Sequence, residues 1–144
     1  MSEKSKPLRW RHTHHYVSGD TVEVGDVPGH ILGAIKGAGL AFFEDGEVAT
    51  HTIAILHDFT DGTGPHRFYV GYQFEDGATL NLRCEGHSTG QGGGKIALSG
   101  TTELIGGSGR FAGVSGSGRY AGRRLVPAAG GAEIYLDFDS SIAR

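Results

Sequence analysis

Hydrophobic and polar residues alternate along most of this chain, and no segment sustains a helical period of apolar residues beyond about two turns. Strict alternation over short runs is typical of half-buried β-strands. The pattern predicts roughly seven or eight strands: RWRHTHHYV (9–17), HILGAIKGAGLAFF (30–43), EVATHTIAILHDF (47–59), RFYVGYQF (67–74), ATLNLRCEG (78–86), GKIALSGTTELI (94–105), GRYAGRRLV (118–126) and AEIYLDFD (132–139).

Glycine sets the connections between these segments. The chain has 26 glycines in 144 residues, well above the usual share of about 7%. Two similar stretches, FFEDGE (42–47) and QFEDGA (73–78), place Asp-Gly between strands and predict two-residue type I′ hairpin turns. Glycines 33, 37 and 39 interrupt a strand and are typical of bends at barrel corners. We therefore predict an all-β fold, a closed antiparallel eight-stranded barrel.

The densest glycine run, GGSGRFAGVSGSGRYAG (106–122), nearly repeats itself. A dinucleotide fingerprint would need GxGxxG before a long helix, and a Walker A loop would need a GK[ST] ending. Calcium-binding β-helix repeats would need an aspartate where Phe111 stands. Strand-like sequence on both sides argues against a linker. The run is best interpreted as a structural crossover whose one large side chain, Phe111, is buried beneath the barrel.

Composition narrows the function classes. The length fits one domain over residues 1–144, with residues 1–7 flexible. A net charge of −3 gives no basic footprint for nucleic acid. The single cysteine, Cys84, cannot form an internal disulfide, and no signal-like or long apolar run occurs. We expect a cytoplasmic protein without nucleic-acid or membrane partners.

The run LIGGSGRFAGVSGSGRYAGRRLV (104–126) resembles the loop-and-strand signature of plant allene oxide cyclases and the related dirigent proteins. HRFYVGYQFEDGATLNLRCEG upstream and EIYLDF downstream extend the resemblance over residues 66–139. It implies an eight-stranded antiparallel barrel with an apolar cavity, often assembled as a homotrimer. It supplies no site residues, because those cyclases use a glutamate and an asparagine on the first strand and this chain has no acid between residues 4 and 19.

Alternation along the strands identifies candidate cavity residues. If the apolar faces turn inward, the interior receives Phe68, Val70, Tyr72 and Phe74, then Leu80, Leu82 and Cys84, then Ile134, Leu136 and Phe138. We expect substrate contacts from Trp10, Thr50, Thr52, Tyr72, Cys84, Leu82 and Phe74. On this interpretation His51, His57, Ile53 and Ile55 face outward and form a contact between subunits, and Glu133 and Tyr135 are exterior.

The first strand carries the candidate chemistry. One face presents Trp10, His12, His14 and Tyr16. Placed inside an apolar barrel, the two imidazoles would stay neutral and could act as bases or hydrogen-bond donors. We assign His12, His14 and Tyr16 as catalytic residues. The competing interpretation is a solvated strand with exposed His12, His14 and His15.

Three functions follow from this site. The first is an enzyme that cyclises or isomerises a mainly apolar small molecule in the cavity, without cofactor or metal. The second is a barrel that binds a hydrophobic ligand without catalysis, as dirigent proteins guide a reaction. The third is a metal-dependent, cupin-like barrel that uses His12 and His14, because H-x-H on one strand face is a familiar ligand spacing.

Overall fold

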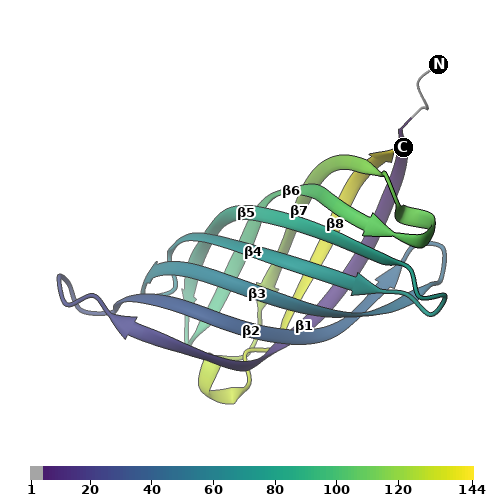
Figure 1. Ribbon diagram of the computed structural model, residues 1–144. Helices are drawn as coiled ribbons and strands as arrows, with labels where there is room; N and C mark the ends of the chain where they lie inside the picture. The colour runs from purple at the N-terminus through teal and green to yellow at the C-terminus, as the bar shows by residue number, and fades with distance from the viewer. Residues whose placement is uncertain (1–4) are drawn as a thin grey trace.

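The computed structural model describes residues 5–144. Eight strands follow one another in chain order and close into an antiparallel barrel, with β1 hydrogen-bonded to both β2 and β8 (Figure 1). The predicted fold class is confirmed. The strands are β1 (Lys6–Glu23), β2 (His30–Phe43), β3 (Val48–Thr60), β4 (Gly64–Gln73), β5 (Thr79–Gly92), β6 (Lys95–Ser108), β7 (Ser115–Arg124) and β8 (Ile134–Ala143), with single 3₁₀ turns η1 (Gly109–Phe111) and η2 (Ala128–Gly130).

The amino-terminal strand begins early. Lys6 and Pro7 pair with Ile142 and Ser141 of β8, so these two positions of the segment predicted to be flexible are strand. Residues 1–4 of that segment lie outside the described part of the chain. Beyond His14 the strand β1 leaves β8 and stays paired with β2 alone as far as Glu23 (Figure 1).

The two Asp-Gly hairpins are not the predicted type I′ turns. Gly46 and Gly77 have φ of 97° and 87°, whereas Asp45 and Asp76 are not among the positive-φ residues. Gly46 N–H donates to the Phe43 carbonyl, and Phe43 N–H donates to Glu47, as do the matching groups around Gly77. Each hairpin is therefore a three-residue loop, a type I turn followed by a left-handed glycine.

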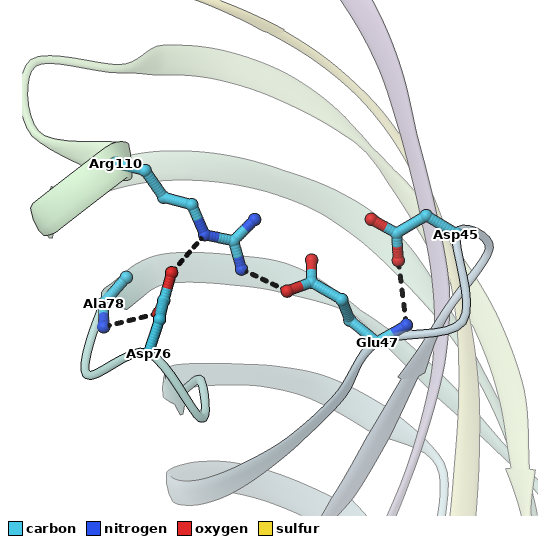
Figure 2. Close-up of polar contacts among 5 residues, drawn as sticks. All are labelled: Asp45, Glu47, Asp76, Ala78 and Arg110. Carbon is cyan, nitrogen blue, oxygen red and sulfur yellow. Dashed lines mark hydrogen bonds and ion pairs between the residues drawn. The ribbon is translucent and has the colours of Figure 1, made fainter.

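One barrel end is closed by the glycine-rich crossover between β6 and β7. Phe111 is 7% exposed and its ring lies 5.0 Å from that of Phe74, so the predicted burial of Phe111 is confirmed. The neighbouring Arg110 binds Asp76 at 2.9 Å and Glu47 at 2.6 Å, and so joins η1 to both hairpin turns (Figure 2). Its guanidinium also covers the rings of Phe74 and Phe111.

Inside and outside follow the predicted alternation on most strands. Trp10, His12 and His14 of β1 are buried, as are the predicted inward sets of β4, β5 and β8. The prediction for β3 is wrong. Ala49, His51, Ile53 and His57 are buried and Ile55 is half-buried, whereas Thr50 and Thr52 are exposed.

The facing strand explains the orientation of β3. Its residues His51, Ile53 and His57 lie opposite Gly39, Gly37 and Gly33 of β2. These glycines leave the interior space that the larger β3 side chains fill, since a Cβ at Gly33 would overlap the His57 ring and one at Gly37 would approach Ile53 Cγ2 to 2.9 Å.

Candidate functional site

The candidate site is a line of buried polar side chains on the inner wall. His12 is fully buried and His14 is 3% exposed. The Trp10 indole N–H donates to the Tyr72 hydroxyl at 2.8 Å, and that hydroxyl lies 2.8 Å from His12 Nδ1. His12 Nε2 lies 3.0 Å from His14 Nδ1. Thus β1 supplies three members of the line, and β4 supplies Tyr72 from across the barrel.

Trp10 fixes the first hydrogen-bond direction in this line, because an indole nitrogen can only donate and the Tyr72 oxygen therefore accepts. We assign the Tyr72 O–H to His12 Nδ1, since this arrangement also gives the hydroxyl hydrogen a partner. His12 then carries its hydrogen on Nε2 and donates to His14 Nδ1. His14 in turn carries its hydrogen on Nε2, an atom that is buried and without a partner in residues 5–144. The line ends on an unused N–H donor.

Burial keeps these groups neutral. Desolvation is the main cause that lowers the pKa of His12 well below its ordinary value, with smaller effects of His14 and His51. Desolvation, then His51 and His15, lowers the pKa of His14 to about 3. Desolvation also raises the pKa of Tyr72 well above its ordinary value. At neutral pH the line therefore donates and accepts hydrogen bonds but carries no charge.

His51, which the sequence analysis placed outside, belongs to the same cluster. Its ring stacks on His12 at 4.2 Å, and its Nε2–H donates to the Thr13 carbonyl at 2.9 Å. His51 pairs with Gly39 of β2, and a Cβ at Gly39 would overlap the Thr13 oxygen that accepts the hydrogen bond from His51. Its Nδ1 is buried and unpartnered within the described chain, and its pKa is lowered by desolvation. The glycine spacing in β2 was the sequence signal for these inward histidines.

A second polar line, also missed by the sequence analysis, joins β4, β5 and β7. His66 Nδ1 is 2.8 Å from Ser88 Oγ, and His66 Nε2 is 2.6 Å from the Tyr120 hydroxyl. Tyr120 reaches His66 across Gly86, where a Cβ would stand 2.6 Å from the hydroxyl. Desolvation lowers the pKa of His66 to about 4. All three side chains are buried, and both nitrogens of His66 are engaged.

His14 and His66 line one inner cavity of about 20 Å³, room for about one water molecule. Most of its wall is apolar, formed by Ile53, Ile55, Phe59, Phe68, Ile96, Leu98, Ile134 and Leu136. The half-buried Tyr16 and Arg124 lie at its outer end with His57. A larger hollow of about 470 Å³ runs over β2–β5 and is lined by Leu32, Leu56 and the charged Asp58, Arg67 and Glu85. His57 and His66 line both this hollow and the inner cavity, whereas His14 lines the inner cavity alone.

The remaining predicted site residues divide into three groups. Trp10, Leu82, Phe74 and Cys84 are buried in the barrel interior, although none of them lines the small cavity. Cys84 donates to Thr102 at 3.4 Å, and burial raises the pKa of its thiol to about 12, which makes it a poor nucleophile. Thr50 and Thr52 project outward from β3 and do not reach the cavity. Tyr16 is half-buried next to a bulge in β1, and Arg124 donates to its hydroxyl at 3.4 Å.

No group of three or more His, Cys, Asp or Glu side chains in residues 5–144 is arranged to hold a metal ion. The facing nitrogens of His12 and His14 are directed at each other rather than at a shared ligand position. Across the same residues, no helix has the length and apolar character needed to span a bilayer. No protein-family model matches the chain, and no curated protein matches it either.

Proposed function

We propose that this barrel widens its inner cavity, which as it stands has room for about one water molecule, to admit a small, mainly apolar molecule and promotes its cyclisation or isomerisation. The observation that carries the proposal is the buried, unpartnered Nε2 of His14, which we assign as an N–H donor, at a mostly apolar cavity. A buried donor without an acceptor is destabilising by about 1–3 kcal/mol. An oxygen atom of a bound molecule would satisfy it, so the preferred ligand carries one uncharged acceptor, such as a carbonyl, ether or epoxide oxygen.

The polar line suits hydrogen-bond donation better than complete proton transfer. If His14 gave up its Nε2 hydrogen, its Nδ1 could take one from His12, which in turn would draw on Tyr72. The raised pKa of Tyr72 opposes the last step. The neutral His14 N–H would therefore polarise the ligand oxygen as negative charge develops on it, while the apolar wall holds the molecule in a reactive conformation.

Binding without catalysis is the second candidate. One observation favours it: the lowered pKa values of His12 and His14 keep both rings neutral at neutral pH, so neither is available as a cationic general acid. Membership of the allene oxide cyclase and dirigent-like barrels is part of the proposal. The closed antiparallel barrel and the buried Phe111 in its glycine-rich crossover support that membership.

The test is to identify small molecules that co-purify with the barrel, by extraction and mass spectrometry, and to assay each for binding and turnover. His14→Phe should reduce binding or turnover about tenfold or more, because the charge-free donor is lost while ring shape is kept. His15→Phe, at the exposed neighbouring position, is the matched control and should behave as the parent. Binding without turnover would select the second candidate, and equal behaviour of both variants would contradict the proposed site.

A homotrimer remains part of the proposal, with a different surface. His51, His57 and Ile53, once expected to form the contact, lie inside. The outer wall of β2 and β3 instead exposes Leu40, Phe42, Val48 and Leu56, with Phe42 paired to Val48. Exposed apolar patches commonly mark contacts. Light scattering at micromolar concentration should give three times the chain mass of 15.1 kDa, and a monomeric mass would contradict the assembly.

The expected cytoplasmic location also stays a proposal. Cys84 is a free, buried thiol, which is compatible with a reducing compartment. Localisation of a tagged chain by fractionation tests it.

A further inference from the structure

Arg124 stands at the outer end of the inner cavity. It is the last residue of β7 and pairs with Ile96 and Ile134 of the neighbouring strands β6 and β8. Its half-buried side chain lines the cavity together with Tyr16 and His57. The Arg124 guanidinium is therefore the one cationic group at the partly exposed end, or mouth, of a mostly apolar cavity in the described residues.

The contacts of Arg124 leave its charge uncompensated. Nε donates to the Gly94 carbonyl at 3.0 Å and Nη1 to the Tyr16 hydroxyl at 3.4 Å, both neutral acceptors. Arg9, Arg11, Arg67, Arg83 and Arg110 each form an ion pair with a carboxylate. In residues 5–144, Arg124 forms no such ion pair within 4.0 Å. The Nη2 group takes part in neither contact, which leaves two hydrogens for a further acceptor.

His57 adds an independent observation at the same place. It is 7% exposed, its ring stacks on Phe59 at 4.4 Å, and its Nδ1 is buried without a partner in the described residues. Desolvation lowers the pKa of His57, and the positive charge of Arg124 lowers it further. The cavity mouth, formed by Arg124, Tyr16 and His57, thus combines the positive charge of Arg124 with the unpartnered Nδ1 of His57.

We propose that this mouth binds an oxyanion group, a carboxylate or a phosphate ester, at one end of the molecule that enters the barrel. Arg124 supplies the charge and a fork of N–H donors, which matches the geometry of both oxyanions. His57, in the tautomer with hydrogen on Nδ1, supplies a further donor. This inference rests on the proposed function, because the same molecule would extend inward toward His14.

Short probes test the mouth without knowledge of the natural ligand. Butanoate, butyl phosphate and 1-butanol share an apolar tail and differ in charge at the head. Binding is measured by NMR from the chemical shifts of the Arg124 side-chain Nε–H and the His57 ring. We expect at least one of the two anions to bind about tenfold more tightly than 1-butanol, and the better anion identifies the head group.

Variants assign this preference to one residue. Arg124→Met should abolish the tenfold difference between anion and alcohol. Arg123→Met is the matched control, since Arg123 is the adjacent arginine, donates to Gln91 and does not line the cavity. Arg123→Met should keep the full difference. If Arg124→Met fails to fold, Arg124→Lys retains the charge and should retain part of the preference, while the anion-to-alcohol ratio of the parent protein is measured regardless.

The outcomes separate this site from the His14 site. Equal affinities for anions and alcohol, no binding of either anion at tens of millimolar, or equal loss in both methionine variants would overturn the oxyanion site and leave the His14 proposal standing. His14→Phe should keep the preference for the anion. Loss of that preference in His14→Phe would show that the anion binds at the cavity floor rather than at Arg124, which also overturns the proposal.

Discussion

Tyr72 is the residue on which the candidate site depends most, because its hydroxyl joins two other members of the polar line. It accepts the indole hydrogen of Trp10 and donates to His12, both at 2.8 Å and both in a fully buried setting. Buried polar groups lose water on folding, so each must find a partner within the protein. Tyr72 provides two such partnerships with one atom.

Tyr72→Phe should therefore destabilise the fold by about 2–4 kcal/mol, because it leaves one buried donor and one buried acceptor unpaired. Urea unfolding followed by tryptophan fluorescence measures the change. Tyr69→Phe removes the same atom from the same strand at a residue that is 43% exposed, and should change stability by less than about 0.5 kcal/mol. Equal effects of the two substitutions would show that the buried hydroxyl is not held as described.

At the scale of elements, the two FEDG hairpins and the 3₁₀ turn η1 form one closed end of the barrel. Asp45 and Asp76 each accept the backbone N–H two residues ahead, which fixes the turns, and Arg110 joins those turns to η1 (Figure 2). The exposed ion pairs of Arg110 contribute little by themselves. The larger contribution comes from the Phe111 ring that Arg110 covers.

Phe111→Ala should destabilise the barrel by about 3–5 kcal/mol, since it removes a buried ring and leaves a cavity against Phe74. Tyr69→Ala is the control, because Tyr69 is 43% exposed on the outer wall. Thermal or urea unfolding compares the two. A loss of less than about 1 kcal/mol for Phe111→Ala would mean that the crossover does not seal the barrel end.

At the scale of the whole molecule, the mainly apolar interior also holds five buried histidines. Desolvation lowers the pKa of His12, His14, His51, His57 and His66. In the unfolded chain these groups have a pKa near 6.5. Below pH 6.5 these histidines bind protons in the unfolded state but stay neutral in the folded state. Stability therefore falls as the pH falls toward the folded-state pKa values, which are about 3 for His14 and about 4 for His66.

We predict a progressive loss of stability between pH 6.5 and pH 4, up to about 1.4 kcal/mol per pH unit for each histidine protonated only in the unfolded chain. Urea unfolding across this range measures it. His14→Phe should make the free energy of unfolding depend less on pH, because one of these histidines is removed. His30 acts in the opposite sense, because hydrogen bonds to Asp26 and Asp58 raise its pKa and its contribution is lost as the pH rises. A profile that stays level from pH 6.5 to pH 4 would place the histidines in solvent.

Short-range pattern was enough to predict the barrel. Alternation and turn residues are local properties, so the strands, the hairpins and the burial of Phe111 could be predicted from the residues alone. The inward face of β4, β5 and β8 followed as well, since each has one face that is clearly more apolar. For β1 the sequence left a buried and a solvated face open, and the structure buries Trp10, His12 and His14. The turn type at Asp45-Gly46 did not follow, because Asp-Gly is compatible with both a two-residue and a three-residue loop.

Alternation groups residues by face but does not say which face is interior when both mix polar and apolar groups. On β3 the threonine face and the histidine face are of that kind, and a shift by one residue exchanges them. The choice depends on β2, where Gly33, Gly37 and Gly39 leave room for His57, Ile53 and His51. The second polar line likewise joins Tyr120 to His66, 54 positions apart. Such partners meet only when the barrel closes, because closure sets the register that brings distant strands into contact.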